Sequence, residues 1–212
     1  MSPFWDARFA EPGYKYGTKP NAWLRQNAPR LAAHSRVLVP GDGEGRNSVW
    51  LAQQGHHVLA MDSSAVGLAK AQALATERGV VINTLCVDLA DWVPEPNSVD
   101  AVVLVYVHLP SALRAVAHRR LANALAPGGW LVLEAFHPLQ IGRDSGGPKD
   151  NRQRRQAPKI SPALRVDPKP DRLLAQGREA ACAKRQRLKR WPKITPRHIT
   201  APSCQGTNSF WP

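Results

Sequence analysis

Cysteine, long apolar runs and secretory features are all scarce in this chain of 212 residues. Its three cysteines, Cys86, Cys182 and Cys204, are too few and too scattered for a disulfide framework or a four-ligand zinc site. No apolar run approaches the roughly 20 residues that a membrane-spanning helix needs. Residues 1–17 lack the basic start and apolar stretch of a secretory signal. We therefore expect a protein in a reducing, cytoplasmic setting, with no metal centre and no membrane partner.

Acidic residues are scarce at one end of the chain only. Residues 1–150 hold 14 Lys and Arg against 13 Asp and Glu, whereas residues 151–212 hold 15 against three. The net charge of +13 therefore belongs almost wholly to the last 62 residues. That segment also contains eight prolines and only nine Leu, Ile, Val or Phe residues, too few to build a core. We expect residues 151–212 to form a basic, proline-rich, disordered tail.

Short apolar runs alternate with helical patterns through the first 150 residues. The expected strands are 36–40, 57–62, 80–88, 99–107 and 130–136, and the expected helices are 47–54, 64–78 and 111–126. Strict alternation of strand and helix favours a parallel sheet with helices on both faces. The sequence thus predicts an α/β fold with a doubly wound, mostly parallel sheet over residues 35–150, in which ligands bind at the carboxyl ends of the strands.

A glycine loop follows the first expected strand. Gly41, Gly43 and Gly45 lie between a strand and a helix, where backbone N–H groups can approach an anion or a polar ligand closely. A dinucleotide fingerprint would need a third glycine where Arg46 stands, which disfavours a nicotinamide-dependent oxidoreductase. A glycine-rich turn is also common for purely structural reasons.

Carboxylates end the next two expected strands. Asp62 lies 21 residues after the first glycine, where an acidic residue can accept the hydroxyls of an adenosine ribose. Asp88 is placed to meet the amine of an adenine, and Leu89 to pack on the ring. Each aspartate alone is equally well explained as a helix or turn cap. Together with the glycine loop they predict an adenosine-containing ligand across three strand ends.

Four segments that carry these residues resemble a known family. VLVPGDGEGRNSVWLA, HVLAMDSS, CVDLADW and LAPGGWLVLEAFHP are similar to the class I S-adenosylmethionine-dependent methyltransferases. Within that class the likeness is to the small-molecule group that includes the tellurite-resistance methyltransferase. The opening WDARFAEPGYKYGTKPNAWL resembles the N-terminal lid of that group, which gives residues 1–34 as lid and first helix. The resemblance implies a Rossmann-like methyltransferase sheet, incomplete at its C-terminal edge.

The resemblance also implies a set of S-adenosyl-L-methionine contacts. They are Gly41, Asp42, Gly43, Gly45, Arg46, Asn47, Asp62, Ser63, Asp88 and Leu89. The glycines would pass under the methionine part, and Arg46 and Asn47 would orient its carboxylate or fix the loop. Tyr14, Tyr16 and Thr18 would lie in the lid over the site. Related enzymes commonly end the first strand with an acidic residue where this chain has Pro40, and Asp42 is the residue nearby that can compensate.

Methyl transfer from a sulfonium is an in-line displacement that depends on alignment and exclusion of water more than on acid–base groups. Residues after the fourth and fifth strands are placed to meet a small-molecule acceptor, and the candidates are Tyr106, His108, Arg114 and His137. His108 is suited to orient or deprotonate an acceptor near neutral pH. A histidine bonded to a loop carbonyl and an arginine on a solvated helix face are the structural alternatives.

The tail leaves two interpretations open. It is either a native extension that binds RNA or another polyanion by neutralising phosphates, or the product of a reading-frame change near residue 150. The first makes an RNA-binding protein or RNA methyltransferase an alternative function. The second, which the composition favours, leaves an impaired methyltransferase whose last strand is an exposed edge.

Overall fold

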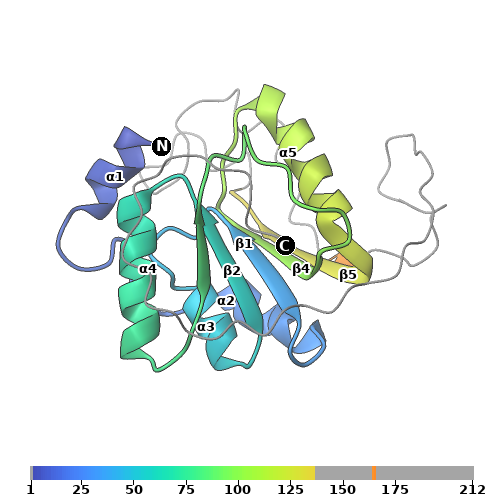
Figure 1. Cartoon of the computed structure of the whole chain (residues 1–212), viewed down its shortest axis with the longest axis horizontal. Helices are drawn as coiled ribbons and strands as arrows, with labels where there is room; N and C mark the ends of the chain where they lie inside the picture. Colours follow the sequence, from blue (N-terminus) through green and yellow to red (C-terminus); the bar gives the residue numbers. More distant parts are fainter. Residues whose placement is uncertain (1, 137–163, 166–212) are drawn as a thin grey trace. The chain divides into compact units, whose positions relative to one another are not determined.

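The sheet lies at the centre of the part of the chain that the computed structural model describes, residues 2–136 and 164–165. Its strand order is β3-β2-β1-β4-β5-β6, with β1 in the middle (Figure 1). The first five strands are parallel and β6 is antiparallel to β5. The strands are β1 Arg36–Pro40, β2 His57–Asp62, β3 Asn83–Cys86, β4 Val99–Val105, β5 Leu125–Glu134 and β6 Leu164–Arg165. This order confirms the doubly wound α/β prediction.

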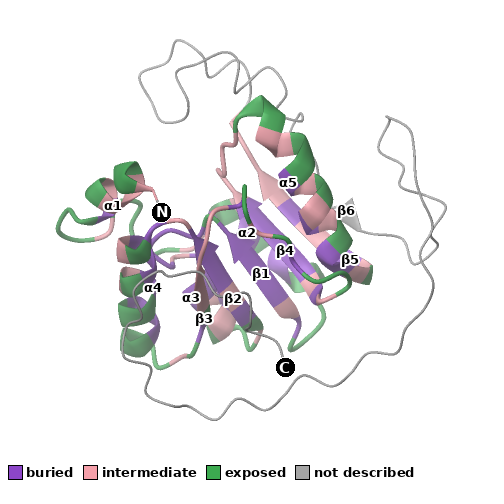
Figure 2. Cartoon of the chain, turned by 45° about the horizontal axis from the view of Figure 1, so that its top comes forward, coloured by how far each residue is buried: buried purple, intermediate pink, exposed green. Residues whose placement is uncertain are grey.

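Helices cover both faces of the sheet because the strands are apolar on both faces. The helices are α1 Pro3–Phe9, α2 Ala22–Asn27, η1 Ala28–Arg30, α3 Ser48–Gln53, α4 Ala65–Glu77 and α5 Ser111–Ala124. Along β1, Val37 and Val39 join a core cluster with α2, α3 and α4, whereas Leu38 joins a second cluster with α5. Figure 2 shows the buried residues along the central strands and the exposed ones on the outer sides of α4 and α5.

Pro40 ends β1 at the point where the chain turns into the glycine loop. Its Cα is paired with Met61 of β2, but a proline donates no ladder hydrogen bond. The backbone N–H of Asp42 instead donates to the carbonyl of Met61 at 3.1 Å. The loop is therefore still attached to β2 just beyond the last residue of β1.

Several element bounds differ from those expected. The last helix ends at Ala124 and β5 begins at Leu125, so Pro127–Gly129 belong to the strand. β4 ends at Val105 because Tyr106 has a φ of 56°, which is incompatible with an extended strand. β3 contains only Asn83–Cys86 of the expected 80–88, and Asp88 follows it in a turn.

The tail contributes a strand, which was not expected. Leu164 and Arg165, which belong to the segment expected to be disordered, pair with Leu131 and Trp130 of β5. The chain divides into residues 1–168 and residues 169–212, and every described residue belongs to the first unit. His137 and the predicted disorder of the rest of the tail lie outside the described residues. None of the helices within the described part has the length and hydropathy needed to cross a bilayer.

Candidate functional site

The glycine loop joins β1 to α3, and all three of its predicted glycines have positive φ angles, between 64° and 90°. A Cβ on each would meet protein atoms rather than open space. At Gly41 it would lie 2.8 Å from Val107, at Gly43 3.0 Å from the Phe9 ring, and at Gly45 2.7 Å from the Ala71 backbone. The glycines therefore allow the loop to pack tightly against α4, against Phe9 of α1 and against Val107 after β4. This packing holds the loop backbone in one conformation.

Asp62 at the end of β2 fixes this loop. Its carboxylate accepts hydrogen bonds from the backbone N–H groups of Gly43 and Ser64, both at 2.9 Å. Burial raises the pKa of Asp62 above its ordinary value, and these backbone bonds oppose the shift. The backbone N–H of Ser63 also bonds to this carboxylate. A carboxylate offers about four lone pairs, so it can still accept a further donor such as a ribose hydroxyl. The residue thus fits the ligand that its position predicts.

Asp42 is buried at the start of α3. Its carboxylate accepts bonds from the backbone N–H and the hydroxyl of Ser48, the first residue of that helix. Burial raises its pKa to about 7, and the Ser48 bonds only partly offset this. Asp42 therefore stabilises the junction between loop and helix. Asp42 is expected to replace the acidic residue that related enzymes commonly carry at the position of Pro40, and that role stays a prediction.

Arg46 and Asn47 connect the end of the glycine loop to the N-terminal segment. The Arg46 guanidinium lies 5.8 Å from the Tyr16 ring centroid and donates to the Tyr16 carbonyl at 3.4 Å. The Asn47 side-chain oxygen accepts the backbone N–H of Asn21 at 3.0 Å. Arg46 and Asn47 are expected either to orient the cofactor carboxylate or to fix the loop, and their described contacts are of the second kind.

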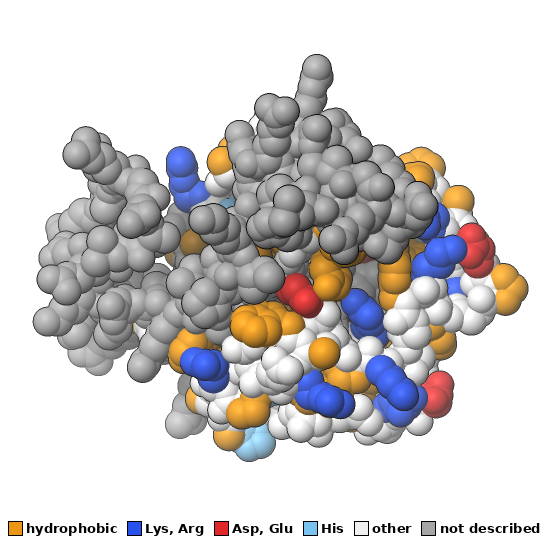
Figure 3. Space-filling model, turned by 180° about the vertical axis from the view of Figure 1, so that it is seen from behind, with side chains coloured by type: hydrophobic (Ala, Val, Ile, Leu, Met, Phe, Trp, Pro, Cys, Tyr) orange, Lys and Arg blue, Asp and Glu red, His pale blue; other side chains and the backbone are white. Residues whose placement is uncertain are grey.

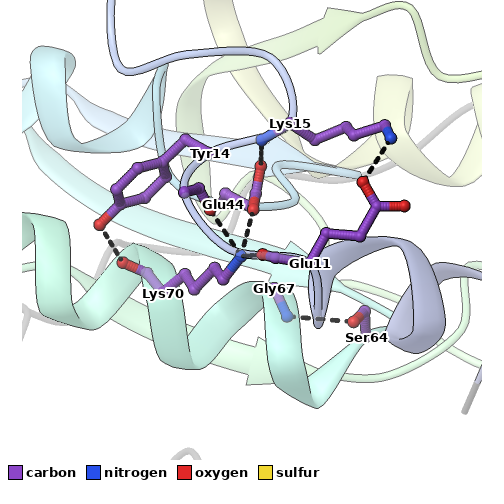
Figure 4. Close-up of polar contacts among 8 residues, drawn as sticks. Glu11, Tyr14, Lys15, Glu44, Ser64, Gly67 and Lys70 are labelled. Atoms are coloured by element: carbon purple, nitrogen blue, oxygen red, sulfur yellow. Dashed lines mark hydrogen bonds and ion pairs between the residues drawn. The ribbon is translucent and has the colours of Figure 1, made fainter.

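A network of charges ties the N-terminal segment to the same loop (Figure 4). Glu44, only 5% exposed, accepts the backbone N–H of Lys15 at 2.7 Å and pairs with Lys70 of α4 at 3.0 Å. The Lys70 ammonium also donates to the carbonyls of Glu11 and Gly13, both at 2.7 Å. Three bonds to this half-buried ion pair thus hold residues 11–15 against the loop and α4.

The lid residues predicted to cover the site lie in different surroundings. Tyr14 packs against the first core cluster, and its hydroxyl donates to the Lys70 carbonyl at 3.4 Å. Tyr16 is exposed and lies beside Arg46, and Thr18 is half-buried. The lid is therefore anchored on α4 through Tyr14, and Tyr16 is the member closest to the glycine loop by described contacts.

Helix α1 is fixed to the loop after β2. Asp6 accepts the Ser64 hydroxyl at 2.6 Å, and the backbone N–H of Ser2 donates to the Ser63 carbonyl at 3.2 Å. Phe9, buried at the end of α1, contacts the backbone of both Gly43 and Gly67. The N-terminal segment therefore holds both the β2–α4 turn, where a ribose is predicted, and the glycine loop.

Asp88 and Leu89 are placed less clearly. The Asp88 side chain accepts the backbone N–H of Ala90 at 2.8 Å, and its carbonyl accepts those of Asp91 and Trp92. Leu89 is buried in the second core cluster. Asp88 therefore makes the contacts of a turn cap, and Leu89 those of a core residue. Their predicted adenine contacts stay a proposal.

Another group of side chains meets at the ends of β4 and β5. The carboxylate of Glu134 accepts the Tyr106 hydroxyl at 3.0 Å and the Asn21 amide at 2.6 Å. The Phe136 ring stacks on Tyr106 at 4.5 Å and on His108 at 5.3 Å between centroids. Two of the three predicted catalytic residues thus share one aromatic group.

Arg114, the third, is placed differently: its guanidinium donates to the Leu109 carbonyl at 2.9 Å at the start of α5. A catalytic role for it stays a prediction.

Sequence reasoning missed the residues whose partners are distant in the chain, which are Asp6, Phe9, Asn21, Glu44, Ser48, Glu134 and Phe136. Two had a readable signal. Glu134 is the single charged residue that ends the apolar run of β5, and Glu44 is a charged residue between two glycines. Within the described part of the chain, no group of three or more His, Cys, Asp and Glu residues has the geometry of a metal site.

A doubly wound sheet whose first glycine loop is bonded to a carboxylate on the next strand defines a cofactor-binding domain of the nucleotide type. Comparison with known families indicates which kind of cofactor-binding domain this is. Residues 37–129 match the family described as a methyltransferase domain. This match supports the prediction of a class I S-adenosylmethionine-dependent methyltransferase, whereas the tellurite-resistance subgroup is not singled out.

Among curated proteins, the chain is 26% identical over 172 residues to 2-heptyl-1-hydroxyquinolin-4(1H)-one methyltransferase of Mycobacteroides abscessus. That alignment covers 79% of this chain and 75% of the relative, so it runs past residue 150 wherever it begins. β6 also lies beyond that residue. The two interpretations of the tail, a native extension and the product of a reading-frame change, stay predictions.

Solved structures share the fold. Phosphoethanolamine N-methyltransferase 1 of Haemonchus contortus matches with a TM-score of 0.55 and 19% identity, over 76% of this chain and 36% of that one. A structure from work on the conversion of a disulfide bond into a thioacetal group during echinomycin biosynthesis matches with a TM-score of 0.53 and 22% identity, over 62% and 60%. The chain spans only 42% to 60% of the first solved structures it matches.

Proposed function

We propose that this chain catalyses S-adenosylmethionine-dependent methyl transfer to a small-molecule acceptor by in-line displacement. The observation that carries the proposal is the bond from the Gly43 backbone to the Asp62 carboxylate at 2.9 Å. It joins the predicted methionine-binding loop to the predicted ribose-binding residue in one rigid unit.

The bound cofactor supplies an electrophilic methyl group on a cationic sulfur. The residues of this chain bind and align it. Asp62 and Ser63 would hold the ribose hydroxyls, Asp88 and Leu89 would frame the adenine, and the loop from Gly41 to Asn47 would lie beneath the amino-acid part. The N-terminal segment, held by the Glu44–Lys70 pair, would exclude water from the site.

The finer proposal concerns the acceptor. The relative from M. abscessus is named for a hydroxylated quinolone, which is a planar aromatic molecule. Tyr106, His108 and Phe136 provide aromatic surface on the acceptor side of the sheet. A planar aromatic compound with a hydroxyl group is therefore the acceptor class we propose, in preference to tellurite, selenite or an aliphatic amine.

Calorimetric titration with S-adenosylhomocysteine tests the cofactor assignment. We expect binding by the wild type and a loss of at least about tenfold in affinity for Asp62→Ala, because at least two polar contacts to the ribose and loop are removed. Asp91→Ala, an exposed aspartate in the turn after β3, is the matched control and should bind like the wild type. Binding of a nicotinamide dinucleotide but not of S-adenosylhomocysteine would refute the proposal.

The alternative of RNA binding depends on residues beyond those described. The described part contains no continuous basic stripe on the face shown in Figure 3, where Lys and Arg side chains lie apart from one another among uncharged ones. RNA binding that persists after deletion of residues 151–212 would favour an RNA methyltransferase. The cytoplasmic setting stays a prediction.

A further inference from the structure

Glu134 is a half-buried carboxylate whose two described partners are neutral. Its oxygens accept a phenol, from Tyr106, and an amide, from Asn21. No ion pair among the described residues includes it. Each oxygen retains a lone pair, so the carboxylate can accept one more donor without losing either partner. Two bonds from separate elements hold it in one orientation, which is what a recognition group requires.

Tyr106 is held in a conformation that few non-glycine residues adopt. Its φ is 56°, and its backbone N–H donates to the Glu134 carbonyl at 2.9 Å while its hydroxyl donates to the Glu134 carboxylate. A left-handed tyrosine is strained and persists where its surroundings fix it, often at a ligand site. The conformation turns the chain away from β4 and keeps the phenol on Glu134.

Three rings lie beside this carboxylate. Phe136 stacks on Tyr106 and on His108 with interplanar angles of 27° and 15°, and all three side chains are partly exposed. Nearly parallel aromatic rings with accessible surface favour the stacking of another planar ring. A neighbouring carboxylate adds a requirement for an O–H or N–H donor on that ring.

This group lies next to the predicted methyl donor. Val107, between Tyr106 and His108 in sequence, is so close to Gly41 that a Cβ there would lie 2.8 Å from its side chain. Asn21, which binds Glu134 through its side chain, also donates its backbone N–H to Asn47 at the end of the glycine loop. The rings and the carboxylate are therefore placed on the side of the loop where an acceptor must approach.

We propose that Glu134, held by Tyr106 and Asn21, together with the stacked rings of Tyr106, His108 and Phe136, forms the acceptor-binding face and selects planar aromatic molecules that carry an O–H or N–H donor. The inference rests on the proposed methyl transfer and adds its specificity determinant. Glu134 positions the acceptor by accepting its hydrogen bond. A purely structural role, tying α2 to β5, is the alternative that the experiment must separate.

The test uses two probes, 1-hydroxyquinolin-4(1H)-one and 1-methoxyquinolin-4(1H)-one, in the second of which a methyl group replaces the hydrogen that Glu134 would accept. Each is titrated by calorimetry into the full chain saturated with S-adenosylhomocysteine. For Glu134→Gln we expect the dissociation constant of the hydroxylated probe to rise about tenfold, because a hydrogen bond to a charged group is lost. The methoxylated probe and S-adenosylhomocysteine should bind as they do to the wild type. Glu95→Gln, at an exposed glutamate, is the control and should change nothing.

Tyr106→Phe is the second variant, because it keeps the charge and removes one bond that orients it. We expect a smaller loss, about threefold, again for the hydroxylated probe only, and this variant decides the matter if Glu134→Gln does not fold. Equal weakening of both probes, or no binding of either by a protein that binds S-adenosylhomocysteine, would overturn the inference and leave the proposed function standing. Failure to bind S-adenosylhomocysteine would overturn both.

Discussion

The two halves of the sheet hold their polar groups in different ways. On the side of β1, β2 and α4, the Asp62 and Asp42 carboxylates are bonded to the backbone of nearby loops, within 19 residues in sequence. On the side of β4 and β5, Glu134 is bonded to side chains 28 and 113 residues away. The Asp62 and Asp42 carboxylates are therefore held by local contacts, and the Glu134 carboxylate by side chains brought together by the fold.

This difference matches two tasks, the binding of a cofactor that many proteins share and the recognition of a particular acceptor. A backbone loop fixed by glycines and one carboxylate can hold the same cofactor in many proteins, whatever the neighbouring side chains are. Side chains at strand ends can change without disturbing the sheet, so they are suited to recognise a particular acceptor. The comparison predicts that substitutions in the first half affect stability and cofactor binding together, and that those in the second affect acceptor choice.

Gly45→Ala should give the largest effect. The new Cβ would lie 2.7 Å from the Ala71 backbone at a φ of 90°, so α4 must move away from the loop. We expect the free energy of unfolding in urea to fall by about 3 to 5 kcal/mol, with loss of S-adenosylhomocysteine binding. Gly79→Ala is the matched control, because its φ is 65° but no atom lies within 4 Å, and it should cost only about 1 kcal/mol. Equal losses for the two variants would refute the packing argument.

Lys70→Met should release the N-terminal segment. It leaves the buried Glu44 carboxylate without its cation and removes two bonds to the carbonyls of residues 11 and 13. We expect a loss of about 2 to 3 kcal/mol in unfolding free energy and faster proteolytic cleavage within residues 10–20.

Lys15→Met is the control for the same segment. It removes an ion pair with the exposed Glu11 but keeps the backbone bond of Lys15 to Glu44. Cleavage at the wild-type rate is expected. If the two lysine variants are cleaved equally fast, the Glu44–Lys70 pair is not what holds the segment.

Asn21 makes one bond within α2 and another to Glu134 of β5, so its variants can separate the contributions of these two bonds to stability. Its side-chain oxygen caps α2 by accepting the Leu24 N–H, and its amide donates to Glu134. Asn21→Ala removes both contacts and should cost about 2 kcal/mol, whereas Asn21→Ser keeps a cap and should cost about 1 kcal/mol. Chemical denaturation measures both. An equal cost would mean that the cap contributes nothing to stability, and the cost that remains in Asn21→Ser measures the loss of the bond to Glu134.

Asp42→Asn should change the pH dependence of stability and should give the smallest effect. Since the folded pKa of about 7 lies above the unfolded value of 3.8, the native state binds an extra proton between these values, and stability falls as the pH rises from about 4 to 7. Asp62 and Arg46 also act on this carboxyl, in opposite directions. The variant should flatten the curve of melting temperature against pH and gain about 1 to 2 kcal/mol at pH 8. An unchanged slope would contradict the assigned burial effect.

Much of the fold was predictable because it follows from local patterns. Alternating apolar strands and helices gave the parallel sheet, and glycine spacing gave the loop at the end of β1. The carboxylate of Asp62 was found because its position follows from strand length. β6 was not found, since a strand of two residues with no apolar alternation has no signal of its own and pairs only because β5 offers an edge.

The candidate site was predictable to a smaller extent. Phe9, Asn21, Glu44 and Glu134 depend on contacts between segments that no local pattern relates. Arg114 was chosen by its position after β4, but helix geometry directs it to the Leu109 carbonyl. Tyr14 was assigned to a lid, and the fold anchors that lid by packing Tyr14 on α4. Sequence reasoning therefore identified the glycine loop and the Asp62 carboxylate bonded to it, whereas contacts between distant segments were beyond its reach; that these residues bind the cofactor and the acceptor stays a proposal.

The bond between Asn21 and Glu134, which lie 113 residues apart, also bears on how the chain matures. Residues near Asn21 are synthesised well before β5, yet their place against the sheet is defined only after β5 has joined β4. Until then the surface destined to receive the acceptor is open to water and to chaperones. Maturation of the acceptor surface should therefore be the slow event in refolding, detectable as a delayed recovery of acceptor binding after cofactor binding has returned.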